Sequence, residues 1–144
     1  MVVESHSLEQ TRAFAAKLAR RVTPGAVIAL NGDLGCGKTE FVRGFVHALN
    51  PVAAVHSPTF TVVNAYQTPR FPVYQFDVYR LGDGAELIEI GFEEYVAASG
   101  VCLIEWAELF AEELPSEVTY HLCFTDCGPT LRRIELIEPQ MPQP

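Results

Sequence analysis

One eight-residue segment constrains this chain more than any other. Gly32-Asp-Leu-Gly-Cys-Gly-Lys-Thr39 satisfies the pattern G-x-x-x-x-G-K-T. The segment follows a short apolar run at residues 26–30 and opens a stretch in which apolar residues recur at helical spacing. A loop between a buried strand and a helix points successive backbone N–H groups at an anion on the helix N-terminus. The sequence therefore predicts a phosphate-binding loop, and the alternative is a plain glycine-rich connection.

Each part of such a loop has a physical role. Phosphate oxygens approach the backbone closely and several residues take positive φ, so glycine is needed where a Cβ would collide. Lys38 is expected to reach the β- and γ-phosphates and the Thr39 hydroxyl to coordinate Mg²⁺. The residues expected to hold the nucleotide are Gly32, Asp33, Leu34, Gly35, Cys36, Gly37, Lys38 and Thr39.

The lysines favour ATP over GTP as the nucleotide. Guanine-specific GTPases resemble one another in an Asn-Lys-x-Asp motif. The chain has two lysines, Lys17 and Lys38, and neither lies in such a sequence.

Two carboxylates are candidates to complete the site. Glu105 directly follows the apolar run at residues 101–104, so its side chain is expected at the sheet edge where ligands of open α/β sheets bind. A magnesium nucleotide site usually has a carboxylate there. Asp77 lies inside an aromatic, β-prone run, where a charge is costly unless paired. The structural alternatives are an ordinary strand-end glutamate and an Asp77–Arg80 contact.

Two further residues have open interpretations. Ser57, in Ser-Pro-Thr-Phe60, is either a γ-phosphate sensor or part of an ordinary turn. Trp106, the only tryptophan, is a core residue, a wall of the nucleotide site or an interface anchor.

The remaining patterns predict an α/β fold, a P-loop NTPase-like sheet with flanking helices and β-hairpins. Ser7-Leu-Glu-Gln10 fits a capping box that starts the first helix, and Pro51 ends the second. The other expected elements are strands at 60–66 and 73–79, short helices at 85–90 and 93–98, a strand at 101–104, and a hairpin of 118–124 with 131–138. We expect a single domain over residues 1–138 and a flexible, proline-rich C-terminal tail at 139–144.

Composition excludes several classes of protein. With 144 residues, 49% of them hydrophobic, the chain matches one folded domain and not a disordered one. No apolar run has the length of a membrane span and no secretory signal is visible, so a cytoplasmic location without membrane contact is expected. The net charge of −8 opposes direct binding to nucleic acid. The four cysteines lack zinc-type spacing and are expected to be buried or incidental thiols, with a Cys123–Cys127 disulfide as the alternative.

Taken together, the motifs resemble the TsaE family of small bacterial P-loop ATPases, also called YjeE. The matching pieces are Glu9-Gln-Thr11, the segment from Gly32 to Thr39, Ser57-Pro-Thr-Phe60, Phe76-Asp-Val-Tyr-Arg-Leu81 and Ile104-Glu-Trp106. The resemblance implies ATP binding and hydrolysis in making threonylcarbamoyladenosine beside the tRNA anticodon. It also implies association with TsaD and TsaB, with tRNA contacted only through the complex.

The resemblance further implies roles for single residues. Thr11 is expected near the nucleotide base, Thr39 and Glu105 on Mg²⁺, and Asp77 in hydrolysis, with Lys38 and Glu105 completing the catalytic set. Asp77 or Glu105 would position the attacking water. Two alternatives from other classes are a small-molecule kinase with the same loop and a nucleotide-gated binding module.

The chain departs from the family pattern at several positions. Glu40 replaces a second threonine. Either its negative charge weakens phosphate binding, or its side chain turns away to solvent. Gln75 replaces a usual histidine, and Cys36 a usual alanine. The family's arginine after a glycine in the last hairpin turn is replaced by Pro129, with Arg132 or Arg133 as possible substitutes.

Overall fold

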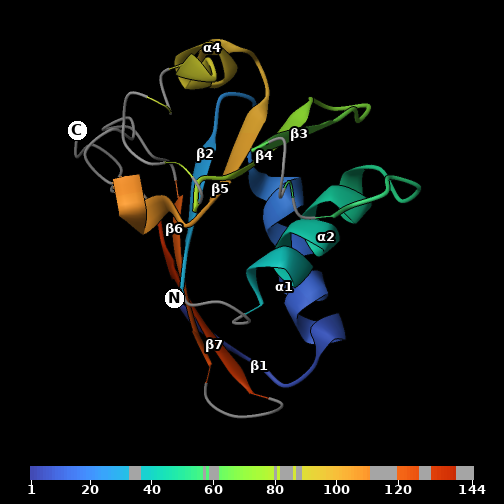
Figure 1. Ribbon diagram of the computed structural model, residues 1–144. Helices are drawn as coiled ribbons and strands as arrows, with labels where there is room; N and C mark the ends of the chain where they lie inside the picture. The colour runs from blue at the N-terminus through green and yellow to red at the C-terminus, as the bar shows by residue number, and fades with distance from the viewer. Residues whose placement is uncertain are drawn as a thin grey trace, which may run out of the picture.

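A mixed sheet with helices on both faces makes up the part of the chain that the structure describes (Figure 1). This computed structural model describes residues 1–32, 37–56, 58, 62–79, 81, 86, 89–110, 120–126 and 131–138. The elements are β1 (Val2–Ser5), α1 (Leu8–Arg21), β2 (Val27–Asn31), α2 (Lys38–Leu49), β3 (Val63–Tyr66), β4 (Val73–Asp77), α4 (Phe92–Ala97), β5 (Val101–Glu105), the 3₁₀-helix η1 (Ala107–Phe110), β6 (Tyr120–Asp126) and β7 (Arg132–Ile137). The predicted α/β class is confirmed.

Four parallel strands form the centre of the sheet. The order across the sheet is β1-β7-β6-β2-β5-β4-β3. Strands β6, β2, β5 and β4 are parallel, whereas the pairs β1–β7, β7–β6 and β4–β3 are antiparallel. β2 and β5 are the continuous apolar runs of the sequence because a central parallel strand is covered on both faces. Their carboxyl ends meet at one edge, where open α/β sheets bind ligands.

The two faces of the sheet bury different cores. Helices α1 and α2 pack on one face, and α4 packs on the other (Figure 1). Alternation along β5 directs Leu103 toward the α1 and α2 face and Ile104 toward the α4 face. Glu105 is therefore directed to the same face as Leu103, which brings it to the beginning of α2.

Both ends of α1 are stabilised by side chains. The Ser7 hydroxyl accepts a hydrogen bond from the Gln10 backbone N–H at 3.1 Å, so the predicted N-cap is confirmed. The Gln10 side chain accepts from the His6 N–H at 2.7 Å, one residue before the position that a capping box requires. At the other end, the Arg70 guanidinium donates to the carbonyl oxygens of Ala19 at 3.1 Å and Val22 at 3.4 Å, which otherwise lack helical partners.

Several expected elements differ in extent. Strand β1 was not predicted and pairs with β7, far away in the sequence. β4 ends at Asp77 instead of residue 79 because the Asp77 side chain accepts from the Tyr79 N–H at 3.0 Å and closes a turn. The final hairpin joins the main sheet, since β6 pairs with β2. Half of the predicted helix at 85–90, the first residues of the strand at 60–66 and the tail at 139–144 lie outside the described residues.

Two expectations concern membranes and thiols. None of the described helices combines the length and apolar character needed to cross a bilayer. Cys102 is buried, Cys123 is half-buried, and both are free thiols. Burial raises the pKa of Cys102 to about 12, which makes it unreactive at neutral pH. Cys36 and Cys127 lie outside the described residues.

Candidate functional site

The predicted loop connects the two elements that a phosphate-binding loop requires. Gly32 follows β2, and Lys38 and Thr39 open α2. Gly37 is the N-cap of α2 with φ of 103°, a left-handed conformation that explains glycine there. As a glycine it offers no side-chain cap to α2, and the uncapped N–H groups at the start of a helix are the groups that bind anions. Asp33, Leu34, Gly35 and Cys36, predicted to touch the nucleotide, lie outside the described residues.

The Lys38 side chain contacts the start of the loop and the residue after β5. This side chain is only 5% exposed. Its Nζ donates a hydrogen bond to the Gly32 carbonyl oxygen at 2.6 Å and lies 3.5 Å from the centre of the Trp106 ring. The ammonium group thus has a carbonyl and an aromatic face as partners. A phosphate at the loop would compete for the same group.

Trp106 forms a wall beside this lysine. Its backbone has φ of 63°, which is rare for a bulky residue, and its N–H donates to the Leu30 carbonyl oxygen at 3.2 Å. Its ring packs on Tyr79, with centroids 4.7 Å apart. Strained backbone of this kind clusters at functional sites. Trp106 is half-buried at the margin of the core on the α4 face, and its role as a wall of the nucleotide site stays a prediction.

Glu105 lies at the carboxyl end of β5 and is 4% exposed. The Thr39 hydroxyl donates to its Oε1 at 3.4 Å, and the Gln75 amide donates to its Oε2 at 3.1 Å. Burial raises the pKa of Glu105, and the neighbouring Asp77 carboxylate raises it further. The Gln75 and Thr39 hydrogen bonds and the charge of Lys38 only partly offset this rise.

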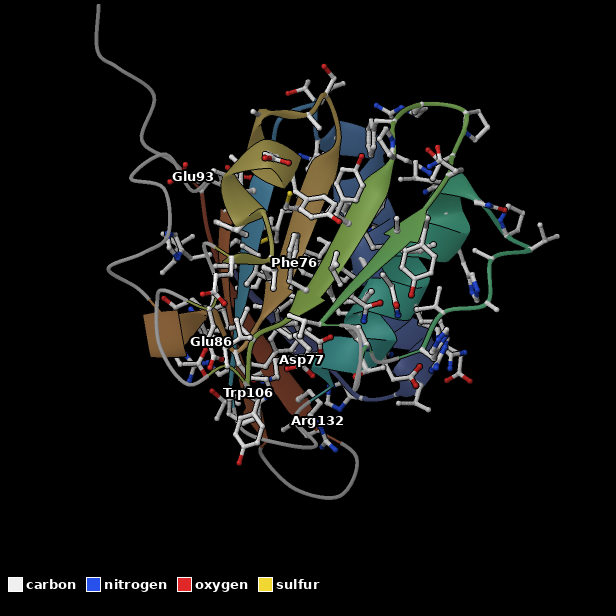
Figure 2. All side chains as sticks on the ribbon, turned by 45° about the horizontal axis from the view of Figure 1, so that its top comes forward. Phe76, Asp77, Glu86, Glu93, Trp106 and Arg132 are labelled. Carbon is white, nitrogen blue, oxygen red and sulfur yellow. The ribbon has the colours of Figure 1, made fainter. Side chains whose placement is uncertain are left out.

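Asp77 occupies the register position beside Glu105. The two residues are Cα partners across parallel β4 and β5. Asp77 is half-buried, and Figure 2 shows it with Trp106 at the edge where these strands end. Arg80, the partner in the structural alternative for Asp77, lies outside the described residues, as does Ser57.

Thr11 occupies the first turns of α1. It is 3% exposed, and its hydroxyl lies 2.6 Å from the Ser5 hydroxyl on β1. This hydrogen bond joins the helix to the edge strand. The structure thus places Thr11 at the junction of β1 and α1, and its contact with a nucleotide base stays a prediction.

Two residues noted as departures from the family pattern, or as substitutes for one, lie near the start of α2. Glu40 pairs with two arginines instead of turning away to open solvent, and its effect on phosphate binding stays a prediction. Its carboxylate accepts from Arg12 Nε at 2.9 Å and from Arg43 of its own helix. Partial burial raises the pKa of Glu40, but these hydrogen bonds and the arginine charges outweigh it, and the net pKa is lowered. Arg132 lies beside the loop, since its Cγ is 3.9 Å from where a Cβ on Gly37 would be.

Sequence reasoning assigned no contact with the site to two of its neighbours, Gln75 and Glu108. Gln75 is fully buried and bridges Glu105 to the Tyr66 hydroxyl, which donates to Gln75 Oε1 at 2.7 Å. The sequence signal for this contact was the position of Gln75 two residues before Asp77, because such residues lie on the same face of a strand. Glu108 of η1 accepts from the Gly32 N–H at 3.5 Å, a contact without a local sequence signal.

The available oxygen ligands fit magnesium. Among the described residues, no group of three or more His, Cys, Asp or Glu side chains could hold a metal ion. Thr39 and Glu105 instead offer a hydroxyl and a carboxylate together. Mg²⁺ takes hard oxygen ligands and usually relies on one or two protein groups plus substrate phosphates. The pair matches that requirement.

Comparison with known proteins identifies relatives over most of the chain. A family model described as "Threonylcarbamoyl adenosine biosynthesis protein TsaE" matches residues 5–133. A Bacillus subtilis protein named "tRNA threonylcarbamoyladenosine biosynthesis protein TsaE" is 46% identical over 109 residues, or 76% of this chain and 68% of the relative. The protein of that name from Haemophilus influenzae is 38% identical over 126 residues, or 86% of this chain and 78% of the relative.

One solved structure supports the fold assignment. The crystal structure of Bacillus subtilis YdiB superposes with a TM-score of 0.76 at 35% sequence identity. The match covers 93% of this chain and 82% of the other. The arrangement of sheet and helices is therefore shared over nearly the whole chain.

Proposed function

We propose that this chain, which belongs to the TsaE family of threonylcarbamoyladenosine biosynthesis proteins, binds ATP with Mg²⁺. It would hydrolyse the ATP in support of this tRNA modification. One observation carries the proposal. Lys38 and Thr39 open α2 beside the carboxylate of Glu105, with the Thr39 hydroxyl 3.4 Å from Oε1. A magnesium nucleotide site needs this combination of an ammonium group for the phosphates with a hydroxyl and a carboxylate for the metal.

Each residue of the site has a role in this proposal. The loop from Gly32 to Thr39 holds the phosphates through its N–H groups, and Lys38 turns from the Gly32 carbonyl to the β- and γ-phosphates. Thr39 and Glu105 would hold Mg²⁺, which supplies positive charge against the phosphates when bound. Asp77, beside Glu105, orients the attacking water, and Thr11 lies near the base.

The partners follow from the family and from charge. We propose that the chain acts with TsaD and TsaB and reaches tRNA only through them. A net charge of −8 leaves few cations for contacts with a phosphate backbone, which supply nearly all non-specific affinity for nucleic acid. We expect the work to take place in the cytoplasm, where tRNA is modified.

The first experiment measures MgATP binding by calorimetry for Lys38→Ala. Losing a hydrogen bond to a charged group costs about 1.5–3 kcal/mol, so affinity should fall roughly tenfold to hundredfold. Lys17→Ala is the matched control, because Lys17 is the only other lysine and is exposed on α1. Equal affinity of Lys38→Ala and the native chain contradicts the assignment of the loop.

The second experiment tests the biological role. Threonylcarbamoyladenosine formation is reconstituted over many turnovers from TsaD, TsaB and tRNA, with the native chain, with Lys38→Ala or without either. The native chain and Lys17→Ala should support modification, and Lys38→Ala should not. Full modification in the absence of the chain refutes the proposal. ADP formation that requires an added small-molecule acceptor supports a kinase instead.

A further inference from the structure

Three polar side chains form a buried row across neighbouring strands. Tyr66 on β3 donates from its hydroxyl to Gln75 Oε1 on β4 at 2.7 Å, and Gln75 Nε2 donates to Glu105 Oε2 on β5 at 3.1 Å. Their exposed fractions are 7%, 0% and 4%. Buried polar groups are costly unless they are hydrogen-bonded, so a row of three in an apolar core requires an explanation.

The strand register sets the direction from which Gln75 meets the carboxylate. Asp77 pairs with Glu105, and Gln75 pairs with Leu103, two residues further from the edge. Gln75 and Asp77 share the α1 and α2 face, whereas Phe76 between them points to the α4 face (Figure 2). Gln75 thus approaches Glu105 from inside the sheet, on the side away from the phosphate loop.

The orientation of the Gln75 amide is fixed by its two partners. An ionised carboxylate only accepts hydrogen bonds, so the NH₂ group of Gln75 must face Glu105. Its carbonyl oxygen then faces the Tyr66 hydroxyl, which donates to it. Because both ends of the amide are engaged, Gln75 cannot rotate without losing a buried hydrogen bond.

The two oxygens of Glu105 consequently have different surroundings. Oε2 accepts from the buried amide, whereas Oε1 lies 3.4 Å from the Thr39 hydroxyl at the start of α2. We propose that Tyr66 and Gln75 are positioning residues that anchor Oε2 of Glu105 and thereby present Oε1, beside Thr39, to the divalent cation of the bound nucleotide. This inference rests on the proposed function, and neither residue touches the nucleotide.

A purely structural pair predicts a different result. A pair that only fills and satisfies the core affects the free energy of unfolding and leaves magnesium dependence unchanged. A positioning pair alters the magnesium dependence, and only while residue 105 is a carboxylate. Side chains that orient metal ligands typically contribute tenfold to hundredfold to metal affinity.

The experiment uses Gln75→Met, which keeps the length of the side chain and removes the amide. Binding of a non-hydrolysable ATP analogue is followed by calorimetry while MgCl₂ is titrated. We expect the MgCl₂ concentration for half-maximal binding to rise roughly tenfold to hundredfold, with magnesium-free binding unchanged. Gln75→His restores an N–H donor and should recover most of the loss.

Tyr66→Phe is the milder variant, and it decides the matter if Gln75→Met does not fold. It removes only the hydroxyl that orients the amide and should shift the MgCl₂ midpoint in the same direction by a smaller factor. Tyr74→Phe is its matched control, since Tyr74 lies on β4 but packs against Tyr95 on the α4 face. This control should leave the midpoint unchanged.

A double-mutant cycle identifies the route of the effect. In a Glu105→Gln background, Gln75→Met should add no further change in magnesium dependence. Additive effects, or a native midpoint for both Gln75→Met and Tyr66→Phe, overturn the positioning role while the proposed function stands. If the native chain binds the analogue without any response to MgCl₂, the proposed magnesium site itself fails, and this inference with it.

Discussion

At the crossing of α1 and α2, Glu40 accepts hydrogen bonds from two arginines, whereas at the carboxyl edge of β4 and β5, Glu105 accepts them from an amide and a hydroxyl. Glu40 lies in the first turn of α2, which follows the phosphate loop, and Glu105 lies at the end of β5, the strand beside β2. Their pKa values move in opposite directions, because the arginine charges outweigh the partial burial of Glu40, while burial dominates at Glu105.

The helix crossing neutralises its charges locally. The helices approach so closely that a Cβ on Gly44 would lie 2.5 Å from the Arg12 Cα. This closeness lets Arg12 reach Glu40 on the other helix, with Nη2 and Oε2 2.6 Å apart. The negative charge near the start of α2 is thus matched before a nucleotide arrives, and it has a structural role.

The sheet edge brings two carboxylates together. Asp77 and Glu105 are paired in register, and Lys38 is the positive charge that lowers the pKa of Glu105 there. Two neighbouring carboxylates repel each other, and ionisable groups with shifted pKa values are typical of functional sites. The comparison teaches that a glutamate paired with arginines joins the two helices, whereas the glutamate at the edge lies among the groups to which the proposed function assigns a cation.

Of the variants that test this comparison, Glu105→Gln should have the largest effect, and it should act on ATP turnover. It keeps the shape of the side chain and removes the charge that the proposed function assigns to Mg²⁺ binding. ATP turnover should fall at least tenfold, which corresponds to losing about 1.4 kcal/mol of transition-state stabilisation. The same loss is expected for Asp77→Asn, and both are measured as ADP release at saturating ATP.

Stability should respond to Glu105→Gln in the opposite sense. A raised pKa in the folded state means that the fold binds the proton more tightly than the unfolded chain does, so stability is lost as pH rises through that pKa. At neutral pH the neutral variant should therefore unfold at the same or a higher temperature, as circular dichroism can show. A clearly lower unfolding temperature would assign Glu105 a structural role like that of Glu40.

Glu40→Gln should give the converse, smaller result. Because Arg12 and Glu40 are 39% and 21% exposed, solvent screens their attraction, and we expect a loss of about 1 kcal/mol in the free energy of unfolding. Magnesium dependence should be unaffected. Glu9→Gln is the control, since Glu9 is also a first-turn glutamate and shares any helix-dipole contribution.

The stability lost in Glu40→Gln should depend on pH with a definite sign. A lowered pKa in the folded state contributes stability that is complete above the ordinary value of 4.5 and disappears as pH falls through the folded-state pKa. Denaturant titrations of Glu40→Gln and the native chain should therefore differ most at neutral pH and converge in acid. A difference that grows below pH 4.5 contradicts the arginine pairing.

The features of the candidate site that the sequence predicted are those formed by residues close together in the chain. The loop, the first turn of α2 and the strand ending at Glu105 each follow from residues that are consecutive in the chain. A buried strand ending on an acid needs no partner to be recognised. The contact between Thr39 and Glu105 then follows because α2 begins, and β5 ends, at the same edge of a parallel sheet.

The missing parts depend on pairing between distant segments. Strand β1 has four residues and is fixed by β7, with Val2 opposite Glu135. The hydrogen bond from Tyr66 to Gln75 requires the register of β3 with β4, and the one from Gln75 to Glu105 requires the register of β4 with β5. Such registers are set by the packing of whole faces and turn geometry and not by a short motif.

The smallest expected effect is optical and concerns the edge where Lys38 lies on Trp106. The ammonium group is 3.5 Å from the ring centre, so its departure toward phosphates should change the fluorescence of the only tryptophan in the chain. ATP with Mg²⁺ should therefore alter the emission in proportion to calorimetric occupancy. Tyr79→Leu removes the ring packed on Trp106 and should change the starting emission but keep the response to ATP. A flat titration of the native chain at concentrations where calorimetry detects binding would show that Lys38 stays on Trp106 when ATP is bound.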